Sequence, residues 1–359
     1  MNTRIMVVGG ALETNVGLSL HEAATTLGIA SELIDTSPAF SGPKLLRTLN
    51  WRFNDRRPVR LHEFSNFVIQ CCREVRPEIL ISTGIAPLTS NALKQLSDLN
   101  VVLANFQTDD PWNKAHSSNW FLEALAHYHF IFSPRTASLR QLRLATSANV
   151  SYLPFGYDRR LFYPETDVTA LTKTPRCDVI FAGGADKDRL AAMESLAKSG
   201  LSLGLYGGYW AKYDFARPFY RGMASAATLR SAHANSRVAV GAVRRANRDG
   251  NSMRTFELAA MGCCCVMEDT VDHRDLFGTE GDAVLYFDTP ESLVAKCLSL
   301  CNDDSARGPM AARVRALMGA GHSYEDRLRA MLAKIQAPFS ALAVATASSD
   351  ADAASAAHA

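Results

Sequence analysis

The sequence predicts an α/β protein made of two Rossmann-like domains that face each other across a cleft. Short apolar runs alternate with amphipathic segments along most of the chain, which is the order expected when crossover helices join the strands of a parallel sheet. A second alternating series begins after the polar segment LTKTP at Leu171–Pro175. The length of 359 residues and the hydrophobic content of 47% suit two cores better than one.

The first domain is expected to span residues 1–170. The strand-like RIMVVGG, a helix over about Val16–Gly28 and the strand ASELIDT make a βαβ opening. The loop GGALETNVG does not match GxGxxG, so a dinucleotide fingerprint is absent. A polar, arginine-rich stretch at Lys44–Arg60 follows. Further strands are predicted at PEILISTG, VVLANFQTDDP, HYHFIFSP and NVSYLPFGYDRRLFYP, and helices at Val68–Val75, Asn91–Leu99 and Trp120–Ala126.

The second domain is expected to span residues 171–336. Its predicted strands are CDVIFAGG, LSLGLYGG, RVAVGAV, Cys263–Met267 and AVLYF. Helices are predicted at Asp186–Ser199, Thr228–Ala234, the segment ending at Gly262, Pro290–Leu300 with Thr289 as its cap, Ala306–Met318 and Tyr324–Ile335. Residues 337–359 are rich in alanine and serine, and we expect a disordered tail there.

Composition and charge disfavour several classes of protein. The formal net charge is +2, and no basic run or basic amphipathic helix is evident, which argues against a nucleic-acid or membrane-surface protein. No apolar stretch reaches the roughly 18 residues of a spanning helix, and the N-terminus lacks a signal peptide's features, so a cytoplasmic protein is expected. The eight cysteines include no CxxC pair. We expect buried, reduced thiols and no metal site.

The segment NSMRTFELAAMG, from Asn251 to Gly262, carries the strongest local signal. Its apolar residues recur at helical spacing, Asn251 or Ser252 can cap the helix, and Gly262 can end it in a left-handed conformation. Arg254 stands in the first turn, where the helix dipole disfavours a cation. Its partner is either Glu257, three residues later, or an anion from outside. Exposed amides and an arginine at a helix start suit a phosphate.

This segment resembles the donor-site signature of GT-B glycosyltransferases. The CgeB-like, spore-maturation branch is the similar one, since four further stretches fit it: DDPW at Asp109–Trp112, YLPFGYDRRLFYP at Tyr152–Pro164, FAGGADKDR at Phe181–Arg189 and HSYEDRL at His322–Leu328. The resemblance covers roughly Asp109 to Leu328. It implies that the second domain binds a nucleotide-diphosphate sugar, with UDP among the candidate nucleotides, and that the first binds the acceptor.

The resemblance also implies roles for acidic residues. In the retaining branch of this fold, two glutamates separated by seven residues contact the donor sugar and the nucleotide ribose. Counting back from Glu257 reaches Asp249, which is one methylene shorter than a glutamate. The resemblance therefore puts Glu257 on the ribose hydroxyls, Asp249 beside the sugar, and Asn251 with the donor-binding residues. An aspartate before Gly250 is also an ordinary turn residue.

A departing nucleoside diphosphate needs positive charge around it. GT-B enzymes resemble one another in supplying this charge from side chains and helix starts, so no cofactor and no metal is expected. The candidates are Arg254, Arg189 and the amides of Gly183 and Gly184 ahead of the next helix. Arg221 lies where the fold usually passes the nucleotide base.

Asp186-Lys187-Asp188 spells DxD, the metal motif of the other major glycosyltransferase fold. Its position between a strand and a helix suits an acidic helix cap, and we interpret it so. Lys187 is a further candidate cation for the phosphate. The alternative is that it is a solvated residue in the first turn of the helix.

A general base is needed if the reaction inverts the sugar. Asp110 and His116 follow a strand of the first domain, in the crevice where such sheets bind ligands. A turn or cap role suits Asp110 equally, because Pro111 follows it. His21, at the first helix, is a second candidate base.

Three functions fit these residues. The first is a metal-independent, hexosyltransferase-like enzyme that moves a sugar from a nucleotide-diphosphate donor to an unidentified glycan, protein or small molecule. The second is a nucleotide-sugar epimerase on the same fold, which needs acid and base residues on both sides of the sugar. The third is a sugar-nucleotide-binding or assembly protein without catalysis.

Overall fold

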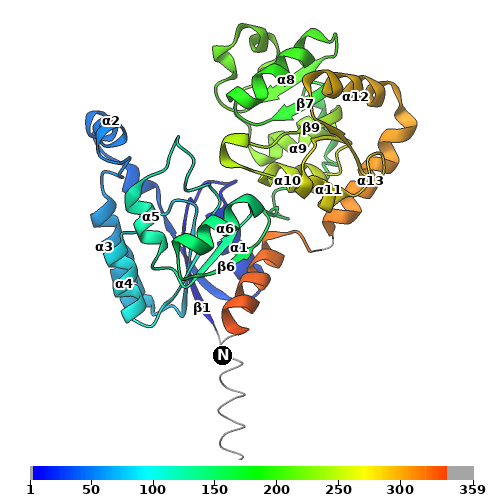
Figure 1. The fold of residues 1–359 in the computed structure, drawn as a ribbon. Coiled ribbons are helices and arrows are strands. Elements are labelled where there is room, and N and C mark those ends of the chain that lie inside the picture. Colours follow the sequence, from blue (N-terminus) through cyan, green and yellow to red (C-terminus); the bar gives the residue numbers. More distant parts are fainter. Residues whose placement is uncertain (1–2, 320, 338–359) are drawn as a thin grey trace, which may run out of the picture.

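The computed structural model describes residues 3–319 and 321–337, which form two domains side by side (Figure 1). A parallel sheet with strand order β2-β1-β3-β4-β5-β6 forms the first domain. Its strands are β1 Arg4–Gly9, β2 Ala30–Asp35, β3 Ile79–Thr83, β4 Val102–Phe106, β5 Phe130–Ser133 and β6 Asn149–Tyr152.

The second domain is built on another parallel sheet, with strand order β11-β10-β9-β7-β8. Its strands are β7 Cys177–Ala182, β8 Leu203–Tyr206, β9 Ser236–Gly241, β10 Cys265–Glu268 and β11 Val284–Phe287. The expected α/β fold with two Rossmann-like domains is therefore confirmed. Most of the expected tail, residues 338–359, lies outside the described residues.

Helices connect the strands in both domains. Those of the first are α1 Val16–Thr26, α2 Lys44–Phe53, α3 Leu61–Val75, α4 Ser90–Asp98, α5 Asn119–Leu125 and α6 Thr136–Ala145. Those of the second are α7 Val168–Thr172, α8 Lys187–Lys198, α9 Ala226–Ala234, α10 Met253–Ala260, α11 Val271–Phe277, α12 Pro290–Asn302 and α13 Asp304–Gly319. None of the helices among the described residues is long and apolar enough to cross a bilayer.

Alternate residues of β1 point to opposite faces of the first sheet. Ile5 and Val7 belong to the core that includes α1, whereas Met6 and Val8 belong to the core that includes α3 and α4. Both faces are thus covered by helices, which is why the strand is apolar throughout.

Four α-helices of the described residues were not predicted from the sequence, namely α2, α6, α7 and α11. Helix α3 also begins seven residues before the predicted Val68, at Leu61. The most consequential omission is α2, because Lys44–Phe53 is a basic amphipathic helix with no buried residue. The expectation that the chain has no such helix was wrong. The apolar residues of this helix stand among arginines, and the whole stretch was therefore taken for polar surface.

The end of the described chain returns to the first domain (Figure 1). Residues 324–337 are helical. The amide of Tyr324 donates to the Tyr157 carbonyl at 3.0 Å, and the Arg327 guanidinium donates twice to the Phe155 carbonyl, at 2.9 and 2.8 Å. Leu328 and Met331 are buried in a core shared with β1. The chain therefore crosses between the domains twice, and the expected domain boundaries stay a prediction.

Candidate functional site in the cleft between the domains

A cleft of about 480 Å³ opens between the two domains. It lies past the carboxyl ends of the strands, where open α/β sheets bind ligands. From the first domain it is lined by Gly10, Asn15, Gly17, Thr83, Gly84, Thr108, Asp109, Arg135 and Phe155, among others; from the second by Gly183, Gly184, Arg189, Arg244, Asn247, Asp249, Ser252, Met253 and Arg254, among others.

The start of α1 forms one wall of this cleft and depends on a close backbone approach. A Cβ atom at position 17 would lie 2.8 Å from the Gly9 Cα and 2.9 Å from the Gly10 carbonyl oxygen. Only glycine fits between β1 and the helix there. Gly17 thereby brings the first turn of α1, with Asn15 and Val16, to the cleft.

The opposite wall includes the start of α10, which has the caps expected from the sequence. Ser252 is the N-cap residue, and its amide donates to the Thr255 hydroxyl at 3.1 Å. Gly262 follows the helix with a φ of +71°, which confirms the predicted left-handed stop.

Arg254 and Glu257 form the local ion pair that the sequence suggested, with 2.5 Å between Arg254 Nη1 and Glu257 Oε2. The Arg254 side chain is 25% exposed and lines the cleft, whereas Glu257 is buried behind it and does not line the cleft. Burial raises the pKa of Glu257, and the Arg254 guanidinium opposes this effect. The buried carboxylate therefore holds the cation at the helix start in spite of the helix dipole.

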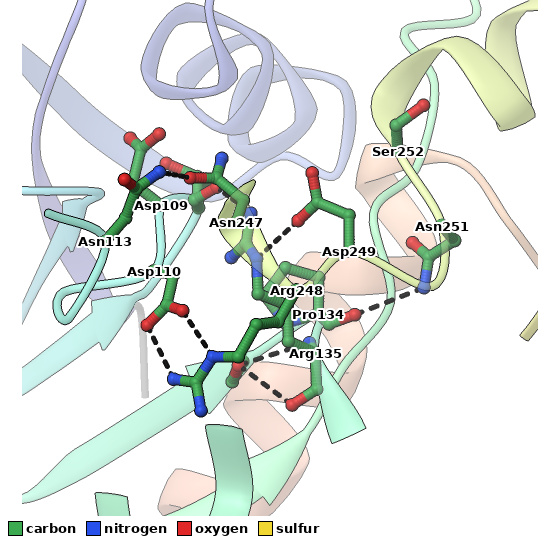
Figure 2. Close-up of polar contacts among 12 residues, drawn as sticks. Asp109, Asp110, Asn113, Pro134, Arg135, Asn247, Arg248, Asp249, Asn251 and Ser252 are labelled. Atoms are coloured by element: carbon green, nitrogen blue, oxygen red, sulfur yellow. Dashed lines mark hydrogen bonds and ion pairs between the residues drawn. The ribbon is translucent and has the colours of Figure 1, made fainter. Parts of the chain in front are cut away.

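Asp249 is paired with an arginine of the other domain (Figure 2). Its Oδ1 lies 2.5 Å from Arg135 Nε, and both side chains are buried. Arg135 also donates to the carbonyls of Gln107 at 2.9 Å and Thr108 at 2.6 Å. Burial raises the pKa of Asp249 to about 6, although Arg135 lowers it. Arg135 thus fixes the carboxylate that the sequence singled out.

Asp110 is held in a second contact between the domains (Figure 2). Arg248 binds it with two contacts, Nε to Oδ2 at 2.5 Å and Nη2 to Oδ1 at 2.8 Å. Next to them, Asn113 Nδ2 donates to Asn247 Oδ1 at 2.5 Å. His116 Nε2 lies 3.0 Å from the Asp110 carbonyl oxygen. Asp110 and His116 are outside the cleft lining, and the neighbouring Asp109 is part of it.

Arg189 reaches the cleft from the first turn of α8. Its Nη1 donates to the Gly184 carbonyl at 3.0 Å and lies 3.2 Å from Asp186 Oδ2, so the loop Gly183-Gly184 is tied to this arginine. Asp186 accepts a hydrogen bond from the Asp188 amide at 3.1 Å. The interpretation of Asp186 as a helix cap is confirmed.

Four other sequence candidates lie away from the cleft lining. Lys187 and Arg221 are exposed. His21 Nδ1 contacts the Ser31 hydroxyl at 2.8 Å. Asn251 is fully buried, where its Nδ2 donates to the Pro134 carbonyl at 3.1 Å and to Asp272 Oδ2 at 2.6 Å. Asn251 thus ties the start of α10 to the first domain.

All eight cysteines are free thiols, and six of them are buried. Cys265 belongs to the core shared by the domains, and burial raises its pKa. The thiols act as core residues, as the sequence predicted.

Sequence reasoning did not identify Arg135. The available signal was its position directly after the predicted strand HYHFIFSP, at the strand end where such sheets bind ligands. Its partner, 114 positions away, could not be read from spacing.

Comparison with known proteins agrees with the fold. Residues 189–333 match a family model described as glycosyl transferase-like, over less than half of the chain. The fold is similar to sucrose-phosphate synthase from Thermosynechococcus elongatus, with 14% identity, a TM-score of 0.68, and coverage of 94% of this chain and 100% of that one. None of the curated proteins is a match.

Two further solved structures share the fold. One is Alr3699/HepE from Anabaena in complex with UDP-glucose, with 12% identity, a TM-score of 0.64, and coverage of 93% of this chain and 99% of that one. The other is a putative UDP-N-acetylglucosamine 2-epimerase from Listeria monocytogenes, with 12% identity, a TM-score of 0.60, and coverage of 95% and 97%. The expected GT-B fold is confirmed, and the CgeB-like branch stays a prediction.

Proposed function

We propose that this protein is a glycosyltransferase that moves a sugar from a nucleoside-diphosphate donor to an acceptor. The observation that carries the proposal is the charge of the cleft. Arg135, Arg189, Arg244 and Arg254 line it together with Asp109 and Asp249, so positive side chains exceed negative ones by two among the lining residues. Glu257 and Asp186, which pair with Arg254 and Arg189, are not part of that lining. A diphosphate ester carries two negative charges, and the cleft therefore complements it.

The second domain supplies the donor site in this proposal. Arg254 and the first amides of α10 face the cleft from one side, and Arg189 with the Gly183-Gly184 loop faces it from another. Helix starts and guanidinium groups both stabilise phosphate oxygens. They meet the charge that develops on the departing nucleoside diphosphate, so the reaction proceeds without a divalent metal. Glu257 is assigned to the ribose hydroxyls on the resemblance described above; because it lies buried behind Arg254, this contact requires the Arg254 side chain to move aside.

Asp109 and Asp249 are the acidic groups nearest to the transferred sugar in this proposal. Asp249 binds sugar hydroxyls while Arg135 holds it in place. Asp109 takes the proton of the acceptor hydroxyl, because it lines the cleft whereas Asp110 is occupied by Arg248.

The experiment measures release of nucleoside diphosphate from UDP-, GDP- and dTDP-hexoses, with glycan, peptide and small-molecule acceptors. Acceptor-dependent release supports transfer. A donor sugar that changes configuration but remains on its nucleotide would instead support an epimerase, the activity in the printed name of one structural neighbour. Nucleotide-sugar binding without turnover of any donor would contradict both enzymatic functions.

A further inference from the structure

Helix α2, Lys44–Phe53, is an unpartnered surface element of the first domain. It stands away from the sheet at the edge of that domain (Figure 1). None of its ten residues is buried. A helix that buries nothing gains little from its own fold, because short isolated helices are marginal in water. Its apolar side chains therefore call for a partner outside the domain.

The large apolar side chains of α2 gather on one face. At about 100° per residue, Leu45, Leu46, Leu49 and Phe53 fall within an arc of roughly 100°. Their exposed fractions are 70%, 47%, 42% and 80%, respectively. Four such side chains in a continuous stripe form a patch, whereas single exposed apolar residues are ordinary on protein surfaces.

The remaining face of α2 is positively charged. Lys44, Arg47 and Arg52 are the charged residues of the helix, and it contains no acidic residue. Three positive charges on ten residues contrast with a net charge of +2 for all 359. Trp51, which is 56% exposed, lies between the basic positions, with the Arg56 guanidinium 5.8 Å from its ring centroid.

We infer that α2 is a docking element for the surface of an anionic lipid bilayer. An apolar stripe of leucine and phenylalanine beside a Lys/Arg-rich face is the composition of helices that lie in the plane of a membrane interface. The basic side chains supply the positive charge that attracts the anionic headgroups.

A second copy of the chain is a poorer occupant of this face. In a twofold dimer the same patch lies on both subunits. Two α2 helices packed through Leu45, Leu49 and Phe53 would bring two sets of three positive charges together. No carboxylate on α2 offsets that repulsion. Lipid headgroups supply the missing negative charge.

The test is co-sedimentation of the full chain with vesicles. The protein should bind vesicles of phosphatidylcholine mixed with phosphatidylglycerol and not vesicles of phosphatidylcholine alone, and added NaCl should weaken binding. Changing Lys44, Arg47 and Arg52 together to Gln should lower the partition coefficient on the order of 100-fold, since each basic residue near an anionic surface contributes about fivefold (~1 kcal/mol).

A second variant tests the apolar stripe, and a third controls for surface changes in general. Leu45→Ser, Leu49→Ser and Phe53→Ser together should lower binding at least about tenfold, because burial of large apolar side chains is lost. The control, Arg140→Gln with Leu144→Ser, changes an exposed basic and an exposed apolar residue of α6 and should bind like the parent. Circular dichroism checks that each variant is folded.

Three outcomes would overturn the inference. The first is no binding of the parent protein to anionic vesicles. The second is undiminished binding by folded α2 variants. The third is a dimer, seen by light scattering, that the serine variant converts to monomers, because this result assigns the stripe to a second copy of the chain. None of these measurements depends on a donor sugar, so they leave the proposed transferase activity to its own test.

Discussion

Replacing Arg254 with alanine should weaken binding of a nucleoside diphosphate far more than binding of the nucleoside. The guanidinium lines the cleft and is 25% exposed, so a bound phosphate can reach it. A hydrogen bond to a charged group contributes about 1.5–3 kcal/mol, which corresponds to a loss of roughly 10- to 150-fold. Partial exposure and the existing pair with Glu257 favour the lower end of that range.

Isothermal titration calorimetry with UDP and uridine, and with the matching guanosine and thymidine pairs, measures this difference. Arg217→Ala is the matched control, because Arg217 is exposed and does not line the cleft. The removal of Arg254 also leaves Glu257 buried without its counter-charge, so thermal unfolding is recorded for each variant. An equal loss for diphosphate and nucleoside, or an equal loss in the control, would refute the reasoning.

Four further outcomes are expected. Glu257→Gln should weaken uridine and UDP by the same factor, since both retain the ribose; unchanged uridine affinity would remove Glu257 from the ribose. Arg135→Gln should lower the free energy of unfolding in urea by about 3–5 kcal/mol, and adding Asp249→Asn should recover part of it. The folded-state pKa of Asp249 is raised to about 6. The proton on Asp249 should therefore add its full share to the free energy of unfolding below about pH 4, and this share, up to ~3 kcal/mol, should be lost as the pH rises through 6. Asp249→Asn should abolish this pH dependence. EDTA should leave turnover unchanged; a strict metal requirement would redirect attention to Asp186 and Asp188.

The sheets were predictable because their strands are covered on both faces. RIMVVG and CDVIFA each hold an uninterrupted apolar run, Ile5–Val8 and Val179–Ala182, and both are strands of the structure. Helix α6 was missed although Thr136–Ala145 is amphipathic; it buries only Ser138 and Leu142. Helix α2 was missed because its apolar stripe stands within an arginine-rich stretch and was taken for polar surface.

The candidate site divides in the same way. Arg254, Arg189 and the glycines of FAGG were found from local sequence and Asp249 from the family resemblance, and all of them line the cleft. Asp110 was selected because it follows a strand. The structure places its neighbour Asp109 in the cleft lining, whereas Asp110 forms an ion pair with Arg248. Sequence position locates a loop at the strand end; which of its side chains is free depends on partners in the other domain.

The loop 244–252 shows why the two domains have to be considered together. It belongs to the second domain by sequence, yet Asp249 is neutralised by Arg135 and Arg248 by Asp110, both from the first domain (Figure 2). Asn247 and Asn251 also hydrogen-bond to that domain. If the domains separated, Asp249 and Arg248 would lose their ion-pair partners. The positions of these two side chains therefore depend on contact with the first domain. Burial and Arg135 of the first domain together set the pKa of Asp249, so its protonation is coupled to the contact between the domains.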